Sequence, residues 1–189
     1  MNDDFAFTTR YDKTAYQALS QASWQMFRKP RLQSQAYPIL AALSVLVAAS
    51  MLVKRDSLEP AIIAGGVGLI VFMLAAIPIS GVTARAKMCS HAMKDAQKKG
   101  PLPAQVHFSF GSDGIRATVN DQTNLMRYSQ VSALAALGSW RFIFFGEAAY
   151  LYRCADLPDE AQAKRLDAWL EEKCGQPFRK LKGEGPKLP

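Results

Sequence analysis

Two long apolar runs dominate the hydrophobic pattern in the first half of the chain. They cover residues 36–53 and 60–84, and neither contains Asp, Glu, Lys, Arg or His. Each has about the length of a membrane-spanning helix, which needs roughly 20 apolar residues. The polar break between them is short enough for only a tight turn. The pattern therefore predicts a transmembrane hairpin over 36–84, made of two antiparallel helices.

Small residues lie within both runs, where they would let helix backbones approach closely in lipid. The predicted helix-packing residues are Ala41, Ser44, Ala48, Gly65, Gly66 and Gly68. Packing within the hairpin is the preferred interpretation, and homodimerisation is the alternative. Because neither run contains an ionisable residue, the pattern does not favour an ion or proton pathway through the hairpin.

A Gly/Pro cluster at the end of 85–103 separates a basic helical stalk from a region with a period of two residues. That period is typical of strands, and turn residues interrupt it at short intervals. The expected strands are 106–110, 115–119, 125–128, 131–137, 141–145 and 149–153. A helix with an acidic first turn follows Pro158 and ends at Gly175. The pattern predicts an antiparallel β domain over 104–175, closed by a C-terminal helix.

The two ends of the chain have different patterns. Residues 1–35 contain an alternating segment, Phe5–Arg10, and then a helical pattern that begins after Asp12. This amphipathic helix is expected to pack on the β domain or to lie on the membrane surface, and the pattern leaves both open. The segment 176–189 is rich in Gly, Pro and Lys, so a disordered basic tail is expected there.

The net charge of +7 raises the question of a nucleic-acid partner, but its distribution argues against one. Residues 105–175 carry seven basic and nine acidic side chains, so the excess lies elsewhere. The basic residues predicted at the membrane surface are Arg28, Lys29, Arg31, Arg85 and Lys87. Lys and Arg beside a span favour the cytoplasmic side. We therefore expect a bacterial inner-membrane protein with both termini in the cytoplasm.

The residues that usually carry chemistry are few and widely spaced. His91 and His107 lie on different expected elements, without a carboxylate at metal-ligand spacing. The three cysteines, Cys89, Cys154 and Cys174, form no C-x-x-C pair and suit a reducing compartment. The sequence predicts no catalytic residue, no cofactor and no metal site, and we expect the chain not to be an enzyme.

Several short strings suggest a family. The strings "HFSFGSDGI", "YSQVSAL" and "WRFIFF", in this order after a strand, a helix and two spans, resemble the YcxB-like bacterial membrane proteins. Tyr128 and Val131 match the aromatic-x-x-aliphatic stretch of that family, whereas Arg153-Cys154-Ala155 replaces its usual Pro-Lys/Arg pair. The resemblance implies a pleckstrin-homology-like barrel of two orthogonal sheets. Because such a barrel has seven strands, we expect Phe5–Arg10 to supply the missing one.

These observations together predict a membrane α+β protein without an active site. Its hairpin would anchor a cytoplasmic pleckstrin-homology-like domain that binds a protein or a lipid headgroup. The slightly acidic β domain favours a protein partner. The alternatives are an immunity protein that neutralises a toxin and an accessory subunit of a membrane transport complex.

Overall fold

The computed structural model describes residues 5–28, 38–39, 41–46, 48–49, 67–68, 71, 83, 85–98 and 102–186. The chain divides into two compact units. One unit comprises Met1–Ser23 and Met88–Pro189, and the other comprises Trp24–Lys87. The first unit therefore combines the beginning of the chain with its second half.

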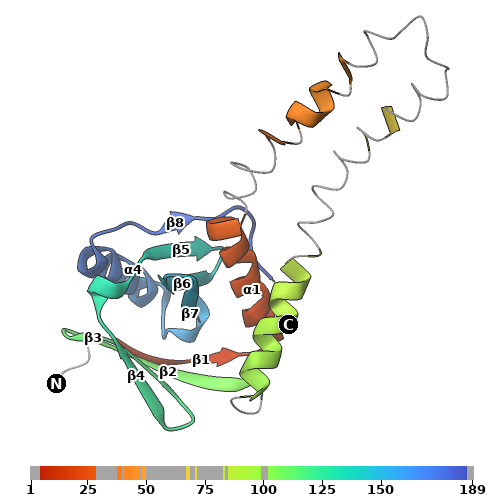
Figure 1. Cartoon of the computed structure of the whole chain (residues 1–189). Helices are drawn as coiled ribbons and strands as arrows, with labels where there is room; N and C mark the ends of the chain where they lie inside the picture. Colours follow the sequence, from red (N-terminus) through yellow and green to blue (C-terminus); the bar gives the residue numbers. More distant parts are fainter. Residues whose placement is uncertain are drawn as a thin grey trace, which may run out of the picture. The chain divides into compact units, whose positions relative to one another are not determined.

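Two four-stranded sheets form the framework of the first unit (Figure 1). The first sheet has the order β1 (Phe5–Tyr11), β2 (Ala104–Gly111), β3 (Gly114–Val119), β4 (Gln122–Met126) and is antiparallel throughout. The second has the order β7 (Ala148–Arg153), β6 (Trp140–Phe145), β5 (Ala133–Leu137), β8 (Arg179–Lys180), with β8 parallel to β5. Helices α1 (Lys13–Ser23) and α4 (Glu160–Cys174), the 3-10 turns η3 (Tyr128–Gln130) and η4 (Cys154–Asp156), and the helical residues 88–98 complete this unit.

The N-terminal segment is an integral strand of the first sheet. It pairs with β2 along its whole length, from Phe5 opposite Phe110 to Tyr11 opposite Ala104. The prediction that Phe5–Arg10 forms a paired strand is therefore confirmed. Because β2 begins about 90 residues later, the whole segment 24–87 is an insertion between two adjacent strands.

Aromatic side chains fill the space between the two sheets. Phe7 of β1 lies 5.4 Å from the ring of Tyr152 on β7 and 5.8 Å from that of Phe108 on β2. Trp169 of α4 reaches the same core, with its ring 6.4 Å from that of Phe110. Leu166 and Leu170 of α4 are fully buried as well.

Helix α1 packs on the β domain through small residues. Ala15, Ala18 and Ala22 are fully buried, and the helix contacts strands of both sheets. Helix α1 therefore packs on the β domain, which is one of the two placements that the sequence left open. A π-helical turn, η1 (Trp24–Arg28), follows it and belongs to the second unit.

We expect Asp12→Ala to lower the free energy of unfolding by about 1 kcal/mol near neutral pH, because Asp12 caps α1. Its carboxylate accepts a hydrogen bond from the Ala15 amide at 3.0 Å and one from the Thr14 hydroxyl. Burial acts to raise the pKa of Asp12, but these hydrogen bonds outweigh it and hold the pKa below 3.8. The contribution is thus fully present above pH 3.8 and is lost as the pH falls through the lower folded-state pKa. Urea unfolding should separate the variant from the wild type near pH 7 and no longer near pH 2. An equal separation at both pH values would contradict this assignment.

The C-terminal segment corrects the prediction of a disordered tail over 176–189. Strand β8 pairs with β5, the Leu181 amide donates to the Ala136 carbonyl at 2.8 Å, and the Trp140 indole donates to the Pro186 carbonyl at 3.4 Å. Gly138, at φ +58°, allows the approach, because a Cβ there would clash with the Glu184 carbonyl. The free edge of β5 thus orders the tail despite its composition. Residues 187–189 lie outside the described residues.

The prediction of a membrane α+β fold with a transmembrane hairpin is wrong. Within the part of the chain that the structure describes, no helix has both the length and the apolar character needed to cross a membrane. The inner-membrane localisation and the cytoplasmic orientation depended on that hairpin and are corrected with it. Much of 36–53 and 60–84 lies outside the described residues.

The structure describes some of the predicted helix-packing and membrane-surface residues and not others. Gly65, Gly66, Lys29 and Arg31 lie outside the described residues. Ala41 and Ala48 are exposed, Ser44 is half-buried, and a Cβ on Gly68 meets no atom within 4 Å, so the described residues do not show the predicted close helix packing. Arg28 ends η1, and Arg85 and Lys87 begin the helical stretch 85–98. The predicted role of these basic residues at a membrane surface stays a prediction.

Candidate functional site

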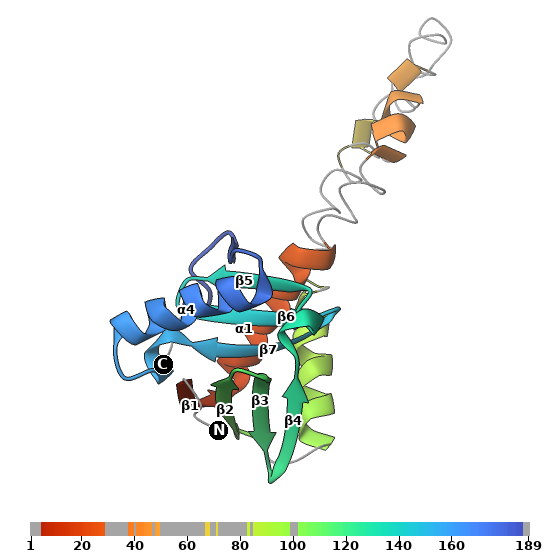
Figure 2. The same ribbon diagram turned by 90° about the vertical axis from the view of Figure 1, so that its left-hand side faces the viewer.

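A cavity of about 410 Å³ lies in the first unit, between the helical residues 88–98 and the first sheet. It is at the end of β1 and β2 marked by the pair Tyr11 and Ala104, whereas Trp169 of α4 contacts Phe5 and Phe110 at the opposite end. Figure 2 shows the helix (light green) running beside β4. Its volume is within the range of ligand-binding cavities, about 300–1,000 Å³.

The walls of the cavity combine apolar and polar surface. Ala92 and Ala96 line it from the helix, one turn apart, and their short side chains leave the space open. Tyr11, Tyr16 and Tyr150 contribute aromatic surface from three different elements. Tyr11 is fixed in place because its hydroxyl bonds to both the amide and the carbonyl of Leu151, at 2.8 and 3.0 Å. Tyr11, which we call the floor of the cavity, is therefore held rigidly. On the helix side, Ala92 and Ala96 present only short side chains to the cavity.

Carboxamide side chains form the polar side of the cavity, one from Asn120 in the β3–β4 turn and two from β4. Gln122 and Asn124 of β4 both line it. Their strand partners on β3 are Val119 and Ala117, and Ala117 is fully buried, which identifies this as the inner face of the sheet. Both carboxamides are nevertheless exposed, because they border the cavity instead of the packed core.

The β3–β4 turn determines the position of these carboxamides. Asn120 and Asp121 have φ values of +48° and +64°, which is the geometry of a two-residue type I′ hairpin. Asn and Asp tolerate this backbone conformation better than most residues. The sequence pattern leaves 120–124 between the expected strands 115–119 and 125–128, so it does not identify Gln122 and Asn124. The Asn-Asp dipeptide between two alternating segments was the signal that could have identified them.

The electrostatic character of the cavity is mildly acidic. Among the described residues that line it, Asp95 is the one charged side chain, and it forms an exposed ion pair with Lys98 at 3.0 Å. A further polar group, Thr9, lies next to the cavity. Thr9 is opposite Val106 on the inner face of the first sheet, and Val106 lines the cavity. Thr9 is fully buried, and its hydroxyl has no hydrogen-bond partner in the described part of the chain. This combination suits neutral polar groups better than anions.

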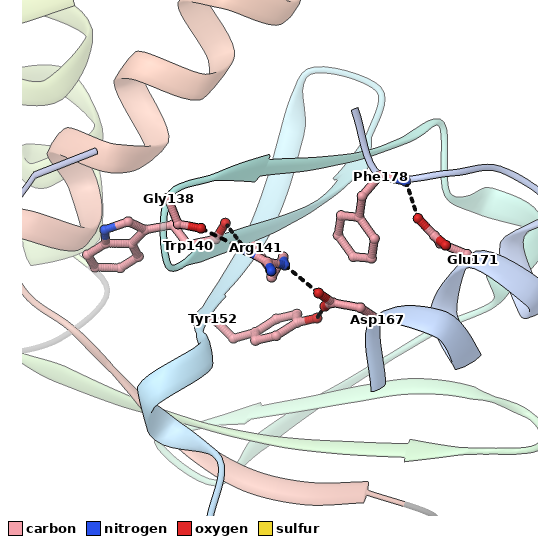
Figure 3. A network of polar contacts seen from close by, with 7 residues as sticks. All are labelled: Gly138, Trp140, Arg141, Tyr152, Asp167, Glu171 and Phe178. Carbon is pink, nitrogen blue, oxygen red and sulfur yellow. Dashed lines mark hydrogen bonds and ion pairs between the residues drawn. The ribbon is translucent and has the colours of Figure 1, made fainter. Parts of the chain in front are cut away.

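A second polar cluster joins α4 to the second sheet (Figure 3). Arg141 Nε donates to Asp167 at 2.7 Å, and the Tyr152 hydroxyl donates to the same carboxylate at 3.0 Å. The Arg141 guanidinium also lies 5.8 Å from the centre of the Phe178 ring, and the Phe178 amide donates to Glu171 at 2.7 Å. These contacts link α4, β6, β7 and the C-terminal segment, so the cluster is structural.

Protonation states in this cluster follow from burial and charge. Burial, reinforced by the nearby Asp167 carboxylate, raises the pKa of Tyr152 well above its ordinary value, so this hydroxyl stays a donor. Burial also raises the pKa of the Cys154 thiol, and it raises that of Cys174 to about 11. Both thiols are thus protonated near neutral pH and are weak nucleophiles.

No arrangement of metal ligands is found within the described ranges, where no three His, Cys, Asp or Glu side chains come together. His107 lies on the outer face of β2, where its Nδ1 is 3.1 Å from the Thr8 hydroxyl. His91 lies on the exposed side of the helix that borders the cavity. The two histidines therefore belong to separate parts of the fold.

No protein-family model, no curated protein and no solved structure matches the chain. The resemblance to the YcxB-like proteins therefore stays a prediction. The cavity has to be interpreted from its own geometry and chemistry.

Proposed function

We propose that the chain contains a non-enzymatic binding domain, and that its cavity beside β4 binds a segment of a partner protein. One observation carries the proposal. Gln122 and Asn124 occupy inward positions of a sheet that is apolar at the neighbouring inward positions, and both border an open cavity. Ligand sites typically combine apolar walls with a few polar groups that fix orientation. A carboxamide offers a donor and an acceptor, as a peptide group does.

The charge around the cavity favours a protein segment over an anionic headgroup. Asp95 is the one charged side chain among its described lining residues, and no Lys or Arg is among them. Phosphate groups are bound by Arg, Lys or clustered backbone amides, and the described lining residues supply no Arg or Lys for an anionic ligand. Residues 105–175, with seven basic and nine acidic side chains, have the same balance.

A binding role also agrees with the chemistry of the nearby residues. A nucleophile needs a base within hydrogen-bonding distance, and the described residues that line the cavity include no His, Cys or Ser. The aromatic and carboxamide side chains are suited to recognition. We therefore infer binding without a covalent step.

The test is to fill the cavity and measure the loss of binding. Peptides selected from a displayed random library on the full wild-type chain serve as probes. We expect Ala96→Trp to weaken their binding by about tenfold or more, because an indole would occupy the space beside β4. Gln97→Trp is the matched control, since Gln97 is exposed on the same helix and does not line the cavity.

Two outcomes would overturn the proposal. Selected peptides that bind both variants equally well would place the site elsewhere. If no peptide is selected and vesicles of phosphatidylglycerol bind the wild type but not Ala96→Trp, the occupant is a headgroup and not a protein segment.

A further inference from the structure

The strand beside the cavity has an unpaired edge. Within the described residues β4 pairs with β3 alone and ends the order of the first sheet. Gln122 and Asn124 of β4 line the cavity that the helical residues 88–98 border. At the corresponding end of the second sheet, the chain's own β8 occupies the edge of β5. The two sheets thus differ, because the chain's own β8 pairs with the edge of β5, whereas no described strand pairs with the outer edge of β4.

Hairpin geometry determines which main-chain groups of β4 are available. In a two-residue hairpin the residues that flank the turn, Val119 and Gln122, form a hydrogen-bonded pair, and the pairs then alternate. Asn124 and Met126 therefore also bond to β3. Thr123 and Leu125 direct their N–H and C=O groups to the free edge. The contact between the Thr118 and Thr123 hydroxyls, at 2.9 Å, agrees with this phase, since side chains approach most closely in non-hydrogen-bonded pairs.

The composition of β4 leaves this edge open to pairing. Proteins usually protect an edge strand with Lys, with Pro, with a bulge or by shortness. Strand β4 is Gln-Thr-Asn-Leu-Met and contains no charge and no proline. Leu125 is 55% exposed, although it is a large apolar side chain. By contrast, the two-residue β8 carries Arg179 and Lys180.

We propose that the partner segment is an extended polypeptide that adds to β4 as a fifth strand of the first sheet. Its main chain exchanges hydrogen bonds with Thr123 and Leu125, and its alternate side chains enter the cavity against Ala92 and Ala96. The five residues of β4 span ~17 Å at ~3.3 Å per residue. The helical residues 88–98 span ~16 Å at 1.5 Å per residue, so the two walls have similar lengths. This inference rests on the proposed function and specifies the partner and its binding mode.

The side chains of the cavity also define the segment that fits. Ala92 and Ala96 leave room for apolar side chains of moderate size, and Asp95 disfavours acidic ones. Gln122 and Asn124 offer hydrogen bonds to polar side chains on the same face of the added strand. The expected ligand is therefore an extended segment without acidic residues at the positions that enter the cavity.

The decisive experiment is amide hydrogen exchange on the unmodified full chain, with a peptide whose binding Ala96→Trp abolishes as the probe. Without peptide, the amides of Thr123 and Leu125 should exchange rapidly, whereas those of Gln122 and Asn124 are protected by β3. At a peptide concentration of 100 times its Kd, exchange at Thr123 and Leu125 should slow by about 100-fold. No side chain is altered in this measurement, so a folding defect does not obscure it.

A pair of variants tests the same hydrogen bonds independently. Leu125→Pro removes one N–H at the free edge, where proline is tolerated in a sheet, and should weaken peptide binding by about tenfold or more. Leu125→Ala shortens the same side chain but keeps the amide, so Leu125→Pro should bind the peptide about tenfold more weakly than Leu125→Ala does. Methyl groups placed one at a time on the backbone nitrogens of the peptide should abolish binding at every second position, where the N–H faces β4.

The possible failures are distinguishable. If no selected peptide is sensitive to Ala96→Trp, the proposed function fails and strand addition fails with it. If a sensitive peptide binds without protecting Thr123 and Leu125, strand addition alone is overturned. If these two amides are already protected without peptide and the chain sediments as a dimer, the edge pairs with a second copy, which also overturns the proposal.

Discussion

Replacing Asp167 with alanine is expected to lower the free energy of unfolding by about 1–3 kcal/mol, because it leaves two donors of a partly buried cluster without their acceptor. The side chains of Arg141 and Asp167 are only 18% and 21% exposed. The variant would leave the Arg141 guanidinium without its counter-ion and the fully buried Tyr152 without the acceptor of its hydroxyl. Urea unfolding of the full chain should show a lower midpoint with an unchanged slope.

Two further variants separate the cost of an unpaired charge from a general defect in α4. The combination Asp167→Leu with Arg141→Met should recover much of the lost stability, because it leaves no charge in the cluster. Glu160→Ala breaks the pair with Lys164 on the same helix, but both side chains are exposed, and we expect no measurable change. If Asp167→Ala unfolded at the same urea concentration as Glu160→Ala, the assigned role of the cluster would be contradicted.

The β part of the fold could be predicted from the sequence because its pattern is local. Alternation placed Phe108 and Phe110 on one face of a strand, and both are fully buried in β2. The expected N-terminal strand also pairs, although its partner is about 90 residues away. In these segments, the period of two and the turn residues carry the same information as the tertiary structure.

The candidate site could not be predicted in this way. Gln122 and Asn124 are polar residues at inward positions, and in sequence they look like the continuation of a turn. Only the register opposite Val119 and Ala117 shows that they share the inner face. The cavity also needs Ala92 and Ala96, which come from a segment interpreted as a stalk. A site formed by residues from several separate segments leaves no contiguous motif.

The two main errors came from treating composition as conformation. The apolar runs 36–53 and 60–84 satisfy the length and charge conditions for membrane helices, but those conditions do not establish a continuous helix. Within the described residues no helix meets the requirement. The tail has the composition of a disordered segment, yet β5 offers it an edge and Arg141 stacks on its Phe178. The conformation of the tail is therefore determined by β5, which lies about 40 residues earlier in the sequence.

Replacing Tyr11 with phenylalanine is expected to lower the free energy of unfolding by about 2–4 kcal/mol, because one hydroxyl satisfies two buried backbone groups. It accepts from the Leu151 amide at 2.8 Å and donates to the Leu151 carbonyl at 3.0 Å. These bonds join β1 of the first sheet to β7 of the second. Burial raises the pKa of Tyr11 far above its ordinary value, so the hydroxyl keeps its proton and both bonds persist across the pH range of the measurement.

The same substitution at Tyr16 is the matched control for Tyr11. Tyr16 also lines the cavity, but within the described residues no hydrogen bond is found for its hydroxyl, so Tyr16→Phe should unfold close to the wild type. Amide exchange gives a local measurement, since the Leu151 amide should exchange faster in Tyr11→Phe and at the wild-type rate in Tyr16→Phe. Equal stability of the two variants, with an unchanged Leu151 amide, would mean that the packing of the ring joins the sheets without help from the hydroxyl. In that case the floor of the cavity would be held by the contacts between aromatic rings, such as the edge-to-face contact of Tyr11 with Tyr16 at 6.2 Å.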